Sequence, residues 1–178
     1  MVHPMSDTPV DLLVITASNG ENLKLAERFA EGAASRGASC ELLDLTTLNF
    51  PVFTPRSKGD TTPQGLSALE TQMSRAQRWV ICAPEYNGSI PPVLSNAIAW
   101  LSVQGSDFRA LFNGRPVVIA SVSGSGGMEL LVSLRLQLIH LGAQVVGRQL
   151  HSTKSKPPRQ ETIDDLLARL LQLQPLVL

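Results

Sequence analysis

Short apolar segments of strand length alternate along this chain with segments of helical periodicity, and no other feature of the sequence constrains the fold as strongly. Apolar runs predict four strands at residues 10–16, 38–43, 79–83 and 116–121. A fifth strand begins at residues 143–146. Apolar residues spaced three and four apart predict helices at residues 22–37, 66–78, 93–102, 128–141 and 160–172. Strands that are separated by helices form right-handed βαβ units, so the alternation predicts a parallel sheet.

Five strands joined in this way fit a flavodoxin-like doubly wound five-stranded parallel sheet with helices on both faces. The chain has the length of one domain, which we place at residues 10–174, after a flexible N-terminal tail at residues 1–9. Pro51, Pro55 and Pro63 predict a stretch without regular structure at residues 44–65.

The composition excludes several classes of protein. The formal net charge is zero, from 15 basic and 15 acidic side chains, which argues against a nucleic-acid partner. No apolar run approaches the roughly 18 residues that a membrane span needs, so we expect no membrane partner. Cys40 and Cys82 are too few for a disulfide scaffold and indicate buried thiols in a cytoplasmic protein. No His, Cys and Asp cluster has metal-ligand spacing, so we expect no metal site.

Three polar loops, at residues 17–21, 84–92 and 123–127, follow the first, third and fourth predicted strands. These strands are neighbours in the flavodoxin-like order, and ligands of such sheets bind outside the carboxyl ends of the strands, so the loops should meet at one site. The first loop leads into a helix N-terminus, which favours an anion such as phosphate. It has neither a Walker sequence nor a dinucleotide fingerprint, and an ordinary capped turn is the alternative interpretation.

The second loop and the helix after it, PEYNGSIPPVLSNAIAWLS at residues 84–102, closely resemble a signature of the NAD(P)H-dependent FMN reductases. These are flavodoxin-like enzymes related to quinone, azo-dye and chromate reductases. The matching positions in this segment are Pro84, Glu85, Tyr86, Asn87, Ser89, Pro91, Leu94, Asn96, Ala97, Ile98 and Trp100. The third loop resembles a second flavin-contacting segment of that family through Ser121, Ser123, Gly126 and Gly127.

The resemblance implies that FMN binds without a covalent link at the strand ends. Its phosphate would contact Thr16, Ser18 and Asn22 of the first loop and helix. The isoalloxazine and ribityl groups would lie against Pro84, Glu85, Tyr86 and Asn87, and the other edge of the ring system would lie against Ser121, Ser123 and Gly124. The chain departs from the family at residues 17–21, which lack the arginine that pairs with the phosphate; Lys24 follows in the first helical turn.

The resemblance further implies an oxidoreductase that transfers a hydride from NADPH or NADH to FMN and then reduces a small acceptor. Quinone, flavin, azo compound and metal oxyanion are all open as the acceptor. The chemistry would be that of the flavin, so no side chain is assigned as catalytic. The family also implies a homodimer or homotetramer that uses the helix at residues 93–102.

Two alternatives to this interpretation stay open. The first is a flavodoxin-like electron carrier or a non-catalytic flavin-binding module; carriers are usually strongly acidic, and the zero net charge argues against one. The second is a relative of the reductases that has lost FMN together with the arginine of the first loop. Separately, the basic segment at residues 148–159 is either a solvated loop or a surface that attracts the phosphates of a pyridine nucleotide.

Overall fold

The computed structural model describes residues 8–60 and 62–177. Its centre is a sheet in the order β2-β1-β3-β4-β5, in which every pairing is parallel, and this is the predicted flavodoxin-like order. The strands are β1 (Val10–Thr16), β2 (Cys40–Asp44), β3 (Ala76–Cys82), β4 (Pro116–Val122), β5 (Gln144–Val145) and β6 (Leu150–Ser152). The first seven residues of the predicted tail lie outside the described residues.

The fifth position of the sheet is divided between two short strands that both pair with β4. β5 lies beside the start of β4, where Pro116 faces Gln144, and β6 lies beside its end, where Val122 faces Ser152. The sequence predicted only the first of these strands. Because β6 restores the pairing at the carboxyl end of β4, the loop after β6 is brought beside the loop after β4.

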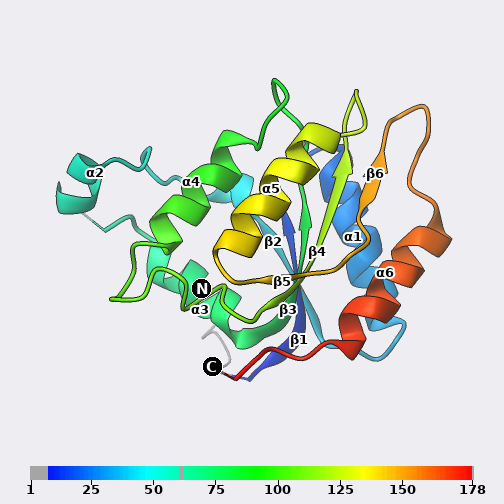
Figure 1. The fold of residues 1–178 in the computed structure, drawn as a ribbon, viewed down its shortest axis with the longest axis horizontal. Helices are drawn as coiled ribbons and strands as arrows, with labels where there is room; N and C mark the ends of the chain where they lie inside the picture. Colours follow the sequence, from blue (N-terminus) through cyan, green and yellow to red (C-terminus); the bar gives the residue numbers. More distant parts are fainter. Residues whose placement is uncertain (1–7, 61, 178) are drawn as a thin grey trace, which may run out of the picture.

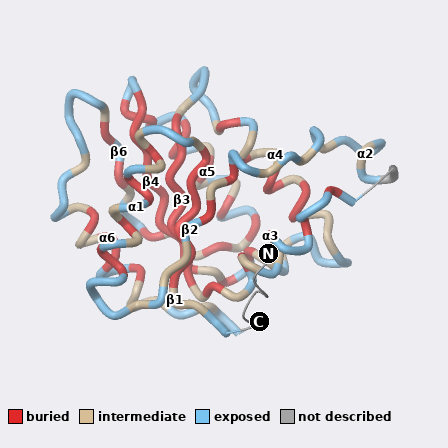
Figure 2. Tube along the Cα trace, turned by 180° about the vertical axis from the view of Figure 1, so that it is seen from behind, coloured by how far each residue is buried: buried red, intermediate tan, exposed pale blue. Residues whose placement is uncertain are grey.

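The helices form one layer on each face of the sheet (Figure 1). They are α1 (Glu21–Ala34), α2 (Pro55–Asp60), α3 (Leu66–Arg75), α4 (Pro92–Leu101), α5 (Met128–His140) and α6 (Gln160–Gln172). Alternate residues of β1 enter two separate cores, because successive side chains of a strand point to opposite faces. Leu13 and Ile15 pack in the core that contains α3, α4 and α5, whereas Leu12 and Val14 pack in the core that contains α1 and α6. The buried strands run through the middle of the molecule (Figure 2).

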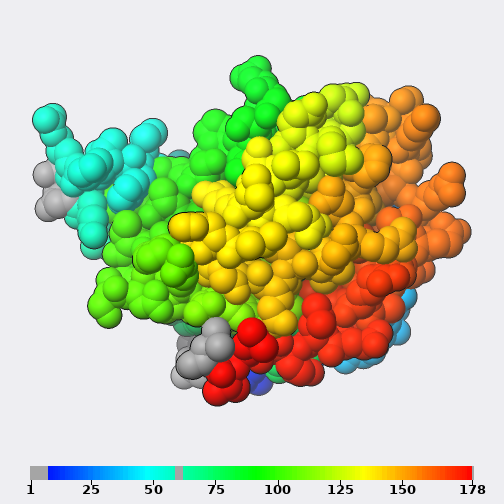
Figure 3. All heavy atoms as spheres, viewed as in Figure 1, coloured from blue at the N-terminus to red at the C-terminus, as the bar shows by residue number. Residues whose placement is uncertain are grey.

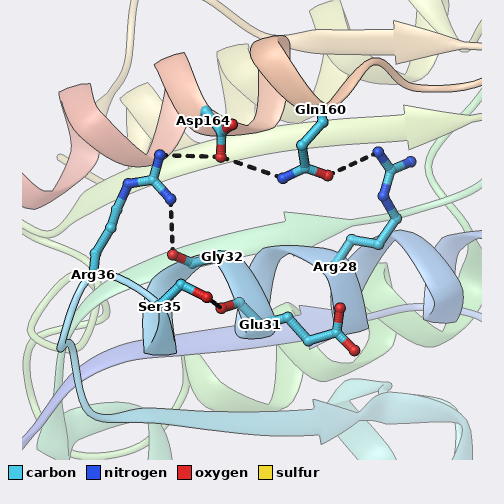
Figure 4. Close-up of polar contacts among 7 residues, drawn as sticks. All are labelled: Arg28, Glu31, Gly32, Ser35, Arg36, Gln160 and Asp164. Carbon is cyan, nitrogen blue, oxygen red and sulfur yellow. Dashed lines mark hydrogen bonds and ion pairs between the residues drawn. The ribbon is translucent and has the colours of Figure 1, made fainter.

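Polar contacts join α1 and the turn that follows it to α6, at the edge of the core that contains these two helices (Figure 4). Arg36 forms an ion pair with Asp164 at 3.0 Å, and Arg28 donates to the side-chain oxygen of Gln160 at 3.0 Å. Arg28 also donates to the carbonyl oxygen of Pro158, in the loop that leads from β6 into α6. These contacts fix the end of that loop relative to α1.

Two sequence predictions are corrected by the structure. The segment at residues 44–65 is not wholly irregular, because it contains a short 3-10 helix, η1 (Leu45–Thr47), and the helix α2. Pro55 begins α2, and proline is tolerated in the first helical turn because its missing N–H would have no partner there. The helix predicted at residues 66–78 ends at Arg75, since the next residue already pairs with β1.

No helix in the described part of the chain is both long and apolar enough to cross a membrane.

Candidate functional site

The loops that follow β3, β4 and β6 rise together at the carboxyl edge of the sheet (Figure 1). They enclose, with the first residue of α1, a cavity of about 410 Å³. Its lining residues are Glu21, Pro84, Glu85, Tyr86, Val122, Ser123, Gly124, Thr153, Lys154 and Ser155. Five of the ten site residues predicted from the sequence are therefore brought together here: Pro84, Glu85, Tyr86, Ser123 and Gly124. Thr16, Ser18, Asn22, Asn87 and Ser121 do not line the cavity.

The first loop runs from Thr16 to the N-terminus of α1. Thr16 is fully buried, and its hydroxyl donates to the carbonyl oxygen of Ser18 at 2.7 Å, so this side chain shapes the loop from beneath. Gly20 precedes α1 and provides no side-chain cap. The N–H groups of Leu23 and Lys24 donate to the carbonyl oxygen of Gly20, whereas those of Glu21 and Asn22 come before the helical ladder, so this end of α1 presents donors that suit an anion.

Asn22 has a different environment from the one that the sequence suggested. Its side chain is buried, and both polar atoms of the amide are used: Nδ2 donates to the carbonyl oxygen of Val122, and Oδ1 accepts from the N–H of Val122, each at 2.9 Å. This pair of hydrogen bonds attaches the start of α1 to the last residue of β4. The amide of Asn22 therefore holds the first loop beside the third.

The second loop contains a tight turn that presents Tyr86. The backbones of Tyr86 and Ser89 exchange two hydrogen bonds, and the intervening Asn87 and Gly88 have positive φ angles of 53° and 69°. Positive φ at both central residues is the geometry of a type I′ turn, for which Asn-Gly is the preferred pair. Asn87 thus shapes the turn, whereas Tyr86 lines the cavity with 49% of its surface exposed.

Glu85 joins the second loop to the third. Its carboxylate accepts from the hydroxyl of Ser125 at 2.5 Å and from the N–H of Leu130 at 3.2 Å. Leu130 lies in the first turn of α5, whose N-cap residue, Gly127, has no side chain to offer. Glu85 therefore caps α5 from another loop, and its negative charge lies at the positive end of the helix dipole.

The Ser125 hydroxyl, together with the N–H of Leu130, holds the pKa of Glu85 below its usual value of 4.5. A pKa that is lowered in the folded state stabilises the protein at pH values above the unfolded pKa, and the stabilisation is lost as pH falls through the folded pKa. We therefore expect the stability difference between the wild type and Glu85→Gln to be largest at neutral pH and to shrink as the pH falls below 4.5 and through the lowered pKa of Glu85. Urea unfolding of both proteins across this pH range measures it. A difference that persists unchanged in acid would show that the charge of Glu85 plays no part.

Gly127, at the end of the third loop, packs closely against Ser121, which lies just before the loop. The hydroxyls of Ser121 and Ser123 are 2.8 Å apart, and Ser123 Oγ also accepts from the N–H of Glu85 at 2.7 Å. A Cβ atom on Gly127 would lie 2.3 Å from Ser121 Oγ, and Gly127 has a φ of +77°. The space and the backbone conformation both require glycine at this position.

The end of the second sequence motif lies away from the cavity. Asn96 accepts from the N–H of Phe53 at 2.8 Å and donates to the carbonyl oxygen of Pro51 at 3.0 Å, and Trp100 Nε1 donates to the same carbonyl at 2.8 Å. These two residues of α4 therefore anchor the segment at residues 51–53. An apolar groove of about 500 Å³ lies between this segment and α4, and none of the ten predicted site residues lines it.

The cations near the cavity have three different surroundings. Lys24 is paired with Glu21 at 2.9 Å on the surface of α1. Lys154 lines the cavity, whereas Lys156 lines a separate polar cavity of about 300 Å³ together with Arg148 and Arg159. Lys154 was not among the site residues predicted from the sequence, because β6 was not predicted. The apolar Leu150 that begins β6 was the sequence feature that could have indicated this strand.

Neither cysteine is suited to nucleophilic chemistry. Burial raises the pKa of the Cys40 thiol to about 11 and that of the fully buried Cys82 thiol still further. The thiolate is the reactive form of cysteine, and both side chains are thiols at neutral pH. Within residues 8–60 and 62–177, no group of three His, Cys, Asp or Glu side chains could hold a metal ion.

A profile of the family described as NADPH-dependent FMN reductase matches residues 10–156 of the chain. This match covers all strands of the sheet, every loop that lines the cavity and Lys154.

Individual relatives are more distant. The quinone reductase of Escherichia coli (strain K12) is 39% identical over 88 residues, which cover 48% of this chain and 45% of that protein. The NADPH azoreductase of Bacillus sp. (strain OY1-2) is 28% identical over 114 residues, which cover 61% of this chain and 58% of that protein. The matched regions thus span about half the length of these two relatives.

Among solved structures, FerB from Paracoccus denitrificans, a flavoenzyme NAD(P)H:(acceptor) oxidoreductase, is similar with a TM-score of 0.72. The similarity covers 92% of this chain and 96% of that chain at 17% sequence identity, so it concerns the fold.

Proposed function

The chain belongs to the NADPH-dependent FMN reductase family, and on this basis we propose that it is an FMN-dependent oxidoreductase. It would take a hydride from NADPH or NADH and reduce a small acceptor, for which a quinone, a flavin, an azo compound and a metal oxyanion are candidates. The observation that carries this proposal is the cavity at the carboxyl edge of the sheet, lined by the second and third predicted loops and bounded by the N-terminus of α1. Cofactors of doubly wound sheets bind at this position.

The residues of the cavity fit FMN in size and chemistry. A volume of about 410 Å³ lies within the range of roughly 300–1,000 Å³ that is typical of such sites. Gly20 and Gly124 both leave open space where a Cβ atom would be, so the backbone can approach a ligand closely. The backbone N–H groups at the start of α1 suit the phosphate, and Pro84 with the half-exposed ring of Tyr86 suits a flat aromatic group.

FMN, when it is bound, supplies the hydride-accepting and electron-donating chemistry. The chain would hold it with the first turn of α1 and Ser18 at one end and with Pro84, Tyr86, Ser123 and Gly124 at the other. Glu85 and Asn22 would act through the loops that they hold, because their polar atoms are already used within the protein. Neither the Cys40 nor the Cys82 thiol is needed for this chemistry.

We further propose that the protein is a cytoplasmic homodimer or homotetramer. The free thiols of Cys40 and Cys82 support a reducing compartment. The helix α5 lies across the face seen in Figure 3. Four apolar side chains along it are exposed and support an association surface: Met128, Val132, Leu136 and Ile139.

Steady-state oxidation of NADPH and NADH in the presence of a quinone tests the proposed activity. We expect the rate to rise with added FMN and to saturate when the protein is fully loaded. A protein that gains no thermal stability from excess FMN, and whose presence does not accelerate the reaction, would contradict the proposal. Binding of FMN without acceleration would instead favour the electron carrier or the non-catalytic binding module.

A further inference from the structure

The first loop poses an electrostatic problem for any phosphate that binds at α1. Residues 17–20 contain no charged side chain, and α1 begins with an acid, Glu21. Lys24 lies in the same helical turn, but its ammonium group is paired with Glu21 at 2.9 Å, so the two charges offset each other. A phosphate would thus rely on helix donors alone unless another segment contributes a cation.

Lys154 comes from such a segment. It lines the same cavity as Glu21 and is the only cation among the described residues of the lining. The pKa of Glu21 is lowered mainly by Lys24 and additionally by the charge of Lys154, so Lys154 lies within electrostatic reach of the start of α1.

The backbone around Lys154 is held in place on both sides. The N–H of Ser123 donates to the carbonyl oxygen of Ser152 at 3.0 Å, which continues the pairing of β4 with β6 up to the cavity. Thr153 then closes a tight turn, in which its hydroxyl accepts from the N–H of Lys156 at 3.0 Å and its N–H donates to the carbonyl oxygen of Lys156 at 3.2 Å. Lys154 is an exposed residue inside this turn, so its side chain is solvated on a positioned backbone.

Neither acid of the cavity forms an ion pair with Lys154, and only the charge of Glu21 acts on it, over a longer distance. Glu85 directs both carboxylate oxygens to Ser125 and Leu130, and Glu21 is paired with Lys24. Lys154 has neither an ion pair nor a side-chain hydrogen bond with any residue in the described ranges 8–60 and 62–177. A flexible ammonium group without an acidic partner, beside a set of helix donors, can pair with a phosphate.

We propose that Lys154, from the loop after β6, is the cation that binds the phosphate of FMN in this protein. This inference rests on the proposed flavin binding and assigns a contact outside the three predicted loops. It also gives the two lysines of the basic segment different roles, because Lys156 lines the other cavity.

The test compares FMN with riboflavin, which has the same ring system and ribityl chain but no phosphate. Flavin is removed from the purified protein, and each flavin is titrated into the wild type, Lys154→Ala, Lys154→Arg and Lys156→Ala by flavin fluorescence. We expect Lys154→Ala to raise the Kd of FMN about tenfold while changing the Kd of riboflavin less than about twofold. Lys154→Arg keeps the charge and should retain most of the affinity for FMN, and Lys156→Ala should leave it unchanged. Added salt should weaken FMN binding more in the wild type than in Lys154→Ala.

Two results would overturn the inference alone: tight FMN binding that Lys154→Ala does not change, or an equal loss of affinity for FMN and riboflavin. The second would mean that Lys154 acts on the loop or on the ring system rather than on the phosphate. A wild type that binds neither flavin would overturn the proposed function and this inference with it.

Discussion

Replacement of Asn22 with alanine is expected to lower the free energy of unfolding of the flavin-free protein by about 2–6 kcal/mol. The reason is that the N–H and the carbonyl of Val122 are both hydrogen-bonded to the Asn22 amide, which is buried. Alanine would leave two buried polar groups without partners, and each costs about 1–3 kcal/mol. Urea unfolding of the protein without flavin measures the loss.

Asn19→Ala is the matched control, because Asn19 is an exposed residue of the same loop. Its stability without flavin should stay within about 0.5 kcal/mol of the wild type. The experiment also separates two roles of Asn22. A side chain that only contacted phosphate would leave the flavin-free protein as stable as the wild type, and that result would contradict the tether between α1 and β4.

Replacement of Gly127 with alanine should destabilise the protein by a similar amount, about 2–4 kcal/mol. The added Cβ would lie 2.3 Å from Ser121 Oγ and 2.8 Å from Ser121 Cβ, so the base of the third loop must move. The positive φ of the residue adds backbone strain for any residue with a side chain. Ser121 is hydrogen-bonded to Ser123, and Ser123 to the N–H of Glu85. Because Ser123 and Glu85 line the cavity, flavin binding should weaken as well.

Gly124→Ala serves as the control for stability within the same loop. A Cβ atom there would meet no atom within 4 Å, and the residue does not have a positive φ. Its free energy of unfolding without flavin should match that of the wild type. Equal stability of the Gly127 and Gly124 variants would show that the loop adapts to the clash, and the account of its base would be wrong.

The sequence predicted the fold well because hydrophobic periodicity is local. The strand at residues 10–16 and the helix at residues 160–172 have the observed bounds, and the strand order followed from the alternation of strands and helices. The predicted bounds of helices and strands were wrong where one residue did not follow the usual sequence preference. Pro55 begins α2 instead of excluding a helix, and β3 starts at Ala76, three residues earlier than its most apolar run.

The candidate site was predictable only in outline. Polar loops after neighbouring strands indicated the right edge of the sheet, but not what each side chain contacts there. Asn22 binds a residue that lies 100 positions away in the sequence, and Glu85 caps a helix that begins more than 40 positions later. Such contacts depend on how the loops pack against one another, so no local sequence pattern predicts them. The same holds for Lys154, which reaches the cavity because β6 extends the pairing with β4.

We propose that this chain passes reducing equivalents from a pyridine nucleotide through FMN to a small acceptor. The most direct measurement is anaerobic mixing of the FMN-loaded protein with NADPH, and separately with NADH, followed by addition of a quinone. We expect the yellow absorbance of bound FMN to be lost on mixing with at least one nucleotide and to return with the quinone. Bound FMN that stays oxidised with both nucleotides would contradict it.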